Sequence, residues 1–256
     1  MLDFLGYLEF ERGLSRNTLE AYRTDLLQFG RWLDEHDLSA DTITGRQVSE
    51  FVADLAAGNG KPPASPATVH RKTACLRSFY RHLRREGVRD SDPTAAITSP
   101  RRGRKLPRVL SRDEINKLLA APSGTEPSAL RDRALLELMY ACGLRASEAI
   151  GLELSDLDMD EHVLRARGKG SKERVVPVGR AAIESLRIYL ERGRPALVRA
   201  PGEAHLFVNF RGGPLTRQGL YKIVRRHAAA VGLADRMSPH TLRHTFATHL
   251  LAGGCD

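Results

Sequence analysis

The segment from Asp90 to Ser111, DSDPTAAITSPRRGRKLPRVLS, constrains the fold more than any other part of this 256-residue chain. It contains three prolines and a glycine, and five of the eight residues from 101 to 108 are basic. Proline removes a backbone donor and interrupts helices and sheets, and a run this charged is not buried. We therefore predict two folded parts, residues 1–98 and 111–256, joined by a basic linker at residues 99–110.

The part before the linker is predicted to consist of four helices. A short one lies near Leu2–Arg12, and Ser15 is a typical N-cap for the next, whose apolar residues recur every three or four positions. The same pattern recurs in TGRQVSEFVADLAA, which stops at Gly58, and in ATVHRKTACLRSFYRHLRREG after the breaker sequence KPPASP. The last of these helices is strongly cationic, and its aromatic residues, spaced like a helix face, are interpreted as core.

The part after the linker mixes helices with a β-hairpin. Ser111 and Glu114 form a capping-box pattern, and SALRDRALLELMYACGL follows as a strongly apolar helix. HVLRARGKGSKERVVPV alternates on both sides of a glycine-rich tip, as a hairpin does. Three more helices are predicted at Arg180–Glu191, Thr216–Val231 and Pro239–Ala252. The expected fold is therefore mainly α with a small β-sheet.

Charge is distributed unevenly along the chain, whose net charge is +9. Residues 1–100 carry 13 basic and 14 acidic side chains, whereas residues 101–256 carry 27 and 17. Basic stretches on an otherwise balanced chain predict a polyanion partner, most often nucleic acid, although a solvated basic surface gives the same count. The candidate DNA-binding residues are Arg71, Lys72, Arg77, Arg81, Arg101, Arg102, Arg104, Lys105, Lys172, Arg174 and Arg217.

Several function classes lack their signatures in this sequence. No Walker A loop, no GxGxxG after a strand and no HExxH motif occurs, so we expect no nucleotide cofactor and no metal. The three cysteines are scattered and form no CxxC pair, which favours a reducing cytoplasm over a disulfide framework. The chain has no apolar run of 18 residues and no signal-peptide pattern at its start, so we expect a cytoplasmic protein without a membrane partner.

Three cationic segments carry the candidate chemistry: CGLRASEAIGL around Arg145, RGKGSKER around Lys169, and PHTLRH around His240 and Arg243. His240 and His244 are spaced as zinc ligands can be, but the arginine between them opposes a cation. A phosphate suits them better, because His240 lies near a helix N-terminus and Arg243 one turn further on offers a planar fork for two oxygens. Fixed positive charge without metal is typical of phosphodiester transfer.

Together, GLRASEAIGL, GKGSKER and SPHTLRHTFATHLL resemble the three catalytic segments of the tyrosine recombinases, in the family's order. The resemblance covers essentially the whole chain and is nearest to the bacterial Xer site-specific recombinases, on the XerD rather than the XerC branch. It implies an N-terminal four-helix, SAM-like core-binding domain at 1–98 and a mixed α/β catalytic domain at 111–256. Duplex DNA would be the substrate, bound by four protomers, either copies of one chain or a pair of related Xer subunits; a DNA translocase as activator is left open.

The resemblance also implies roles for individual residues. Arg145 and Arg243 would bind nonbridging oxygens of the scissile phosphate, His240 would act as general acid/base, and Lys169 would protonate the 5′-oxygen leaving group. Glu148 matches an acidic position that orients the first arginine; His244 and His249 match no catalytic position. The implied function is strand cleavage and rejoining through a 3′-phosphotyrosyl intermediate, in the resolution of chromosome dimers at cell division.

Two family elements, a GH motif and the tyrosine nucleophile that follows it, have no counterpart among residues 1–256. The six tyrosines, Tyr7, Tyr22, Tyr80, Tyr140, Tyr189 and Tyr221, are interpreted as packing residues. We therefore expect a chain truncated before the nucleophile, monomeric when free of DNA, that binds DNA without cleaving it. A DNA-binding module and a type IB topoisomerase are the alternatives; the N-terminal segment favours a recombinase over the latter.

Overall fold

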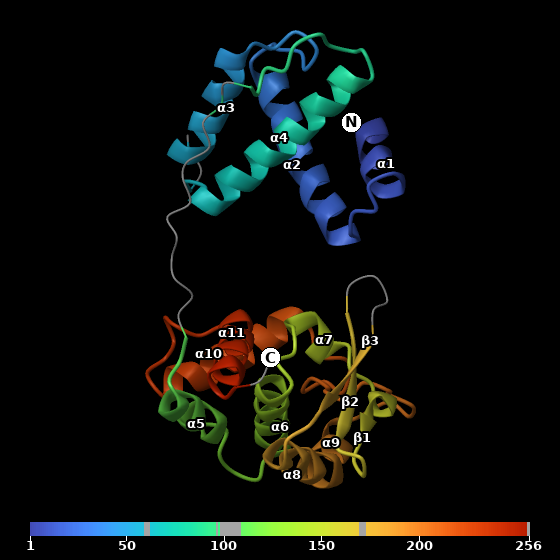
Figure 1. The fold of residues 1–256 in the computed structure, drawn as a ribbon, viewed down its shortest axis with the longest axis vertical. Coiled ribbons are helices and arrows are strands. Elements are labelled where there is room, and N and C mark those ends of the chain that lie inside the picture. Colours follow the sequence, from blue (N-terminus) through green and yellow to red (C-terminus); the bar gives the residue numbers. More distant parts are fainter. Residues whose placement is uncertain (59–61, 96, 98–108, 169–172, 255–256) are drawn as a thin grey trace. The chain divides into compact units, whose positions relative to one another are not determined.

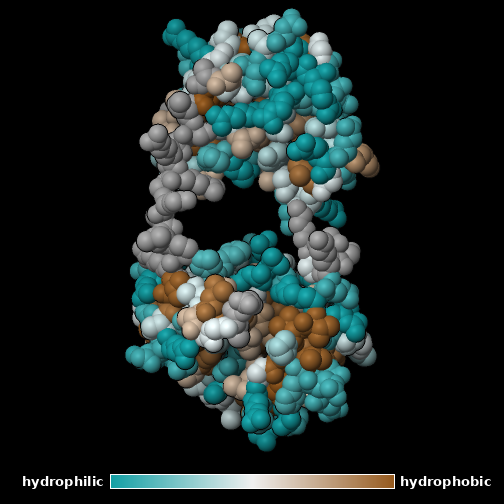
Figure 2. Space-filling model, viewed as in Figure 1, coloured by the Kyte–Doolittle hydropathy of each residue, from teal (hydrophilic) through white to brown (hydrophobic). Residues whose placement is uncertain are grey.

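The computed structural model describes residues 1–58, 62–95, 97, 109–168 and 173–254 (Figure 1). The chain divides into two compact units, Met1–Lys105 and Leu106–Asp256, each with a hydrophobic core of its own. In the described residues, no helix is both long and apolar enough to cross a membrane. Figure 2 shows hydrophilic residues over most of the visible face of the N-terminal unit, and patches of hydrophobic residues on that of the C-terminal unit.

In its described residues, the N-terminal unit contains the four predicted helices. Thr44 caps the third in a complete capping box, and Gly58, where the sequence predicted the end of this helix, adopts the left-handed conformation. Ser65 caps the fourth with Pro66 in its first turn. Apolar side chains from all four helices form one core around the buried Tyr80. The helices are α1 (Leu2–Phe10), α2 (Arg16–Glu35), α3 (Gly45–Ala57) and α4 (Pro66–Arg85).

The C-terminal unit is built around α6, a helix buried on several sides. Its Leu135, Leu136 and Leu138 have no exposed surface, as expected for the strongly apolar stretch of this helix. The predicted helix at Arg180–Glu191 ends earlier, because a π-helical turn at Tyr189–Gly193 interrupts it. The helices are α5 (Arg112–Ala120), α6 (Pro127–Ala141), α7 (Ala146–Ile150), α8 (Arg180–Ile188), α9 (Arg194–Leu197), α10 (Arg217–Ala230) and α11 (Pro239–Ala252).

The sheet has three antiparallel strands in the order β1-β2-β3 (Figure 1). The predicted hairpin is present: β2 (Val163–Arg167) pairs with β3 (Glu173–Pro177), with Ala166 opposite Arg174. A two-residue strand, β1 (Leu157–Asp158), adds to β2 and was not predicted. The observed fold confirms the prediction of a mainly α protein with a small β-sheet.

A buried ionic cluster fixes α10 against α6. Asp132 of α6 is completely buried and accepts hydrogen bonds from Arg131 (2.6 and 2.9 Å) and from Arg226 of α10. His227 of α10 lies 2.8 Å from the same carboxylate. The neighbouring cations outweigh the cost of burial and keep the pKa of Asp132 below its ordinary value. This cluster holds the helix that carries Arg217 and Tyr221 in place behind the site described next.

Candidate phosphate-binding site

A buried carboxylate, Glu148, organises the candidate site. Its side chain is 1% exposed and lies on α7, the short helix for which Arg145 is the N-cap residue. The carboxylate accepts a hydrogen bond from the Arg145 backbone N–H (2.8 Å) and another from Arg145 Nη1 (2.8 Å). The arginine side chain remains 53% exposed, so Glu148 holds its base while its outer face is open to solvent.

Two further arginines converge on the same carboxylate from distant parts of the chain. Arg174 of β3 donates two parallel hydrogen bonds, from Nη1 to Oε1 (2.9 Å) and from Nη2 to Oε2 (2.8 Å). Arg243 of α11 lies with its Nη1 3.7 Å from Glu148 Oε2. The site therefore joins α7, β3 and α11 through one side chain.

The charges at this site do not balance. Three guanidinium groups surround one carboxylate, which leaves two positive charges in excess among these four side chains. The arginines more than offset the cost of burying the carboxylate and lower the pKa of Glu148 from 4.5 to about 2. Partial burial, followed by repulsion from Arg145, lowers the pKa of Arg243. A partly exposed cluster of this kind gains stability from an anion that supplies negative charge.

The turn between α6 and α7 brings α11 close to Arg145. Gly143 ends α6 with a φ of +56°, and a Cβ there would lie 2.2 Å from the Phe246 ring of α11. Arg243, one turn before Phe246, donates a hydrogen bond from Nη1 to the Gly143 carbonyl (2.5 Å). A residue with a side chain at 143 would be strained by its backbone conformation and would displace α11, so glycine is required for the two arginines to meet.

His240 lies at the start of α11, as predicted. Ser238 caps the helix by accepting a hydrogen bond from the Thr241 N–H (3.1 Å), and Pro239 occupies the first turn. The His240 side chain is exposed, and its ring lies 6.4 Å, centroid to centroid, from that of Tyr221 on α10. His240 and Arg243 thus lie one turn apart on one helix, and Tyr221, interpreted as a packing residue, lies next to the site.

The other histidines of α11 are arranged differently. His244 is exposed, and His249 Nδ1 is hydrogen-bonded to the hydroxyl of Tyr140 on α6 (2.8 Å). Among the described residues, no group of three or more His, Cys, Asp and Glu side chains could hold a metal ion. At the start of α11, the exposed His240 and Arg243 one turn further on present hydrogen-bond donors to an anion.

The structure places the candidate DNA-binding residues of α4 in three ways. Lys72 is buried and donates hydrogen bonds to Asp25 (2.8 Å) and Gln28 (2.6 Å) of α2, which argues against the predicted phosphate contact. Arg71 pairs with Asp25 from a more exposed position, and Arg77 donates to the carbonyl of residue 97. Arg81 is exposed and lines an open pocket of about 460 Å³ with three other arginines.

In the C-terminal unit, Arg217 is exposed in the first turn of α10, where a phosphate could reach it. Arg174, by contrast, has both of its terminal nitrogens on Glu148. Lys169, Lys172, Arg101, Arg102, Arg104 and Lys105 lie outside the described residues.

Comparison with known proteins agrees with this geometry. Residues 108–256 match the phage integrase family, and residues 2–87 match the phage integrase N-terminal SAM-like domain. The chain belongs to the phage integrase family. Because members of this family are the tyrosine recombinases, the resemblance carried by the three cationic segments is confirmed.

Relatives of the XerD type cover nearly the whole chain. Tyrosine recombinase XerD of Halalkalibacterium halodurans is 42% identical over 255 residues, which span 99% of this chain and 84% of that protein. XerD of Mycobacterium tuberculosis is 41% identical over 262 residues, with 99% and 84% coverage. The solved structure of XerH recombinase in a post-cleavage complex with its palindromic difH substrate has a TM-score of 0.74 at 26% identity, and covers 94% of this chain and 71% of that one.

Two features of the recombinase site were missed from the sequence. Arg174 was interpreted only as a DNA contact, because its local context, KER in a basic hairpin, shows no acidic partner nearby other than its neighbour. Tyr221 gave no signal at all, since its proximity to His240 depends on how α10 packs against α11. The glycine after the apolar helix was visible in the sequence, and such a glycine commonly ends a helix in the left-handed conformation that Gly143 adopts. It is the sequence signal from which the close approach of α11 could have been suspected.

Proposed function

We propose that this chain carries the DNA-binding and phosphate-binding parts of a site-specific DNA recombinase, whose reaction passes through a 3′-phosphotyrosyl intermediate and resolves chromosome dimers at cell division. The observation that carries the proposal is the convergence of Arg145 and Arg243 on one buried carboxylate, with His240 one turn from Arg243. A protein that only binds the phosphate backbone of DNA has no need of a buried carboxylate on which three arginines converge. The names of the XerD relatives support the same activity.

In the proposed mechanism, the scissile phosphate replaces solvent over the arginines. Arg145 and Arg243 bind its two nonbridging oxygens and neutralise the charge that develops in the pentacoordinate transition state. A tyrosine hydroxyl attacks the phosphorus and forms the 3′-phosphotyrosyl bond as the bond from phosphorus to the 5′-oxygen breaks. His240 acts as general acid/base and takes the proton of the attacking hydroxyl, and Lys169 protonates the 5′-oxygen that leaves. Fixed positive charge does the work, so neither metal nor nucleotide cofactor takes part.

The proposal extends to the assembly. Four protomers, identical or of two related Xer types, act on two duplex sites in the cytoplasm; activation by a DNA translocase is left open. The chain comprises a core-binding domain at 1–98 and a catalytic domain at 111–256, and Arg81, Arg217 and the basic linker at 99–110 contact the DNA backbone outside the scissile phosphate. The solved structure of a λ integrase tetramer bound to a Holliday junction supports the proposed assembly of four protomers.

We further propose that residues 1–256 bind DNA without cleaving it. Tyr80 and Tyr189 have no exposed surface, and the Tyr140 hydroxyl is hydrogen-bonded to His249. Tyr7 and Tyr22 belong to the N-terminal unit. Tyr221 lies beside His240, but its partly buried ring packs against the C-terminal core. None of the six is thus suited to act as the nucleophile.

A nicked suicide substrate tests these proposals. In a form of the protein that includes the tyrosine nucleophile of the family, Arg145→Ala and Arg243→Ala should each abolish formation of the covalent protein–DNA adduct and leave the affinity for the duplex within about threefold. Equal loss of binding would instead make both residues DNA contacts without a catalytic role, which is the DNA-binding-module alternative.

The polypeptide of residues 1–256 should give no adduct that survives SDS. If it gives one, Tyr221→Phe decides its origin: loss of the adduct in that variant would make Tyr221 the nucleophile and refute our interpretation of the tyrosines. Binding of the same polypeptide should weaken steeply with salt, because neutralised phosphates release counterions.

A further inference from the structure

Arg174 binds the buried carboxylate with both terminal nitrogens of its guanidinium group. Glu148 accepts four hydrogen bonds between 2.8 and 2.9 Å; two come from Arg145 and two from Arg174. A carboxylate has about four acceptor sites, so these bonds saturate it. Because the two guanidinium groups share one carboxylate, the position of each determines the position of the other.

Arg174 reaches Glu148 from the inner face of the hairpin. It lies opposite Ala166, which is completely buried, and residues opposite each other in an antiparallel pair point to the same face. Its pKa is raised by the hydrogen bonds to Glu148, so it is held as a cation there. To contact a DNA phosphate it would have to leave a buried carboxylate with half of its hydrogen bonds broken, which is costly.

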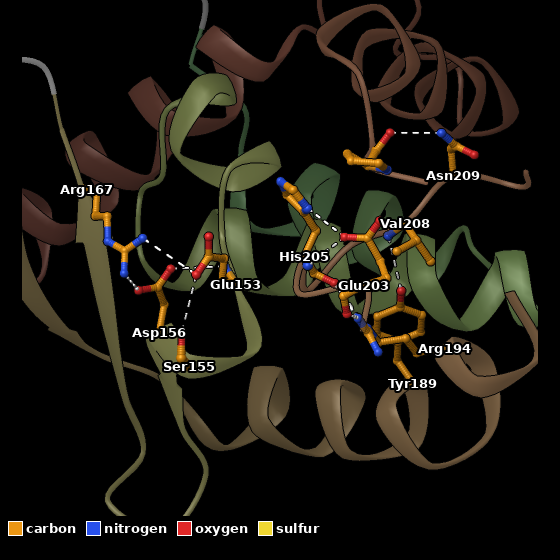
Figure 3. A network of polar contacts seen from close by, with 11 residues as sticks. Glu153, Ser155, Asp156, Arg167, Tyr189, Arg194, Glu203, His205, Val208 and Asn209 are labelled. Carbon is orange, nitrogen blue, oxygen red and sulfur yellow. Dashed lines mark hydrogen bonds and ion pairs between the residues drawn. The ribbon is translucent and has the colours of Figure 1, made fainter. Parts of the chain in front are cut away.

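The outer face of the same hairpin carries a second arginine that does not touch Glu148. Arg167 of β2 lies 2.8 Å from Asp156, and its other acidic neighbours are Glu153 (3.9 Å) and Glu173 (3.5 Å). Figure 3 shows the Arg167 guanidinium directed at Asp156 and Glu153. Asp156 is buried, like Glu148. The two arginines therefore fasten opposite faces of one hairpin, each on a buried carboxylate.

We propose that Arg174 is a positioning residue of the recombinase rather than a DNA contact: it fixes the Glu148 carboxylate so that Arg145 and Arg243 face the scissile phosphate. This inference rests on the proposed function. Without Arg174, Glu148 has two free acceptor positions, and Arg145 and Arg243 can both turn inward to fill them. The phosphate then loses the donors that these arginines would otherwise present, whereas the rest of the DNA interface is unchanged.

The test compares Arg174→Gln, Arg174→Lys and the matched control Arg167→Gln in the same form of the protein that includes the tyrosine nucleophile of the family. Single-turnover cleavage of a suicide substrate is measured at saturating protein, together with duplex affinity as a function of salt and thermal unfolding. We expect Arg174→Gln to slow cleavage about 100-fold, the loss typical of displaced catalytic groups, with the salt slope of binding unchanged. Arg167→Gln should cleave within about threefold of the wild type.

A substrate with a methylphosphonate at the scissile position adds a readout that simple structural damage would not change. This phosphate analogue has no charge and depends less on the arginines. The defect of Arg174→Gln should therefore shrink to less than about tenfold on it, whereas a defect caused by a damaged fold would persist.

Three results would overturn the inference: a salt slope lowered by about one, which marks a lost phosphate contact; an equal defect in Arg167→Gln; or an unreduced defect on the methylphosphonate. If Arg174→Gln unfolds, Arg174→Lys decides, because lysine keeps the charge but lacks the planar fork. Slow cleavage by Arg174→Lys supports the positioning role of Arg174, and cleavage at the wild-type rate refutes that role. If Arg145→Ala cleaves normally, it is the proposed function that fails.

Discussion

Replacing Glu148 by glutamine should destabilise the C-terminal unit and leave the N-terminal unit unchanged. The carboxylate is buried, and its surroundings lower its pKa from 4.5 to about 2. A difference of about 2.5 pKa units corresponds to about 3 kcal/mol of preferential stabilisation of the charged form in the folded state. Glutamine keeps the shape but turns one acceptor into a donor that faces guanidinium groups, so most of this free energy should be lost at pH 7.

The pH dependence of this loss follows from the sign of the shift. The folded-state pKa is depressed, so the stabilisation is fully present above about pH 5 and is lost as the pH falls toward 2. The difference in unfolding free energy between wild type and Glu148→Gln should therefore shrink across that window. In the wild type, protonation of Glu148 in acid should weaken its ion pairs with the arginines and lower the free energy of unfolding. The variant has no carboxylate at this position, so this part of the pH dependence should be missing.

The chain offers a built-in control for the assay. Its single tryptophan, Trp32, is buried in the N-terminal core, so its fluorescence in a urea titration reports the unfolding of that unit. Amide hydrogen exchange of peptides from α7 and β3, followed by mass spectrometry, reports the C-terminal unit. We expect exchange to accelerate there by roughly a hundredfold, in line with about 3 kcal/mol, with an unchanged fluorescence midpoint. Unchanged protection of α7 and β3 at pH 7 would refute the reasoning.

Three further substitutions have definite expected outcomes. Gly143→Ala should lower the free energy of unfolding of the C-terminal unit by at least about 2 kcal/mol, measured by thermal melting, because of its positive φ and the clash with Phe246. Lys72→Met should lower the Trp32 fluorescence midpoint in urea and leave the salt slope of DNA binding unchanged, because Lys72 is paired with Asp25 in the core. Arg81→Ala should do the reverse: an unchanged midpoint, and a salt slope smaller by about one.

The sequence predicted most elements because local signals define them. Helix α11 has the predicted bounds, Pro239–Ala252, since a cap, a proline and a terminal glycine mark its ends. The predicted helix at Arg180–Glu191 was too long because nothing in its periodicity announces the π-helical turn, where Gly193 allows the backbone to pass close to Tyr189. Strand β1 was missed because two residues are too few to alternate.

The site was predictable only in part, for a different physical reason. Arg145, His240 and Arg243 stand in short motifs whose residue types already suggest a phosphate, and the structure places the two arginines around one carboxylate. The ion-pair partner of a given basic residue could not be predicted, because its position in the sequence does not show which side chains lie next to it in the fold. Lys72 and Arg174 were both interpreted as DNA contacts from the basic stretches around them, yet each is paired with a buried carboxylate at least 26 residues away.

These two pairings share a logic that bears on how such a protein binds DNA. A side chain that neutralises a buried carboxylate cannot leave it for a phosphate without leaving that carboxylate buried and unpaired. The desolvation penalty of such a charge is about several kcal/mol per ion. The positive side chains therefore divide into those committed to the fold, such as Lys72 and Arg174, and those with exposed ends, such as Arg81 and Arg217. Arg145 belongs to both groups, because its backbone and one nitrogen bind Glu148 while half of its side chain stays exposed. That double position is what a residue needs if it is to be rigid before the phosphate arrives and still reach it.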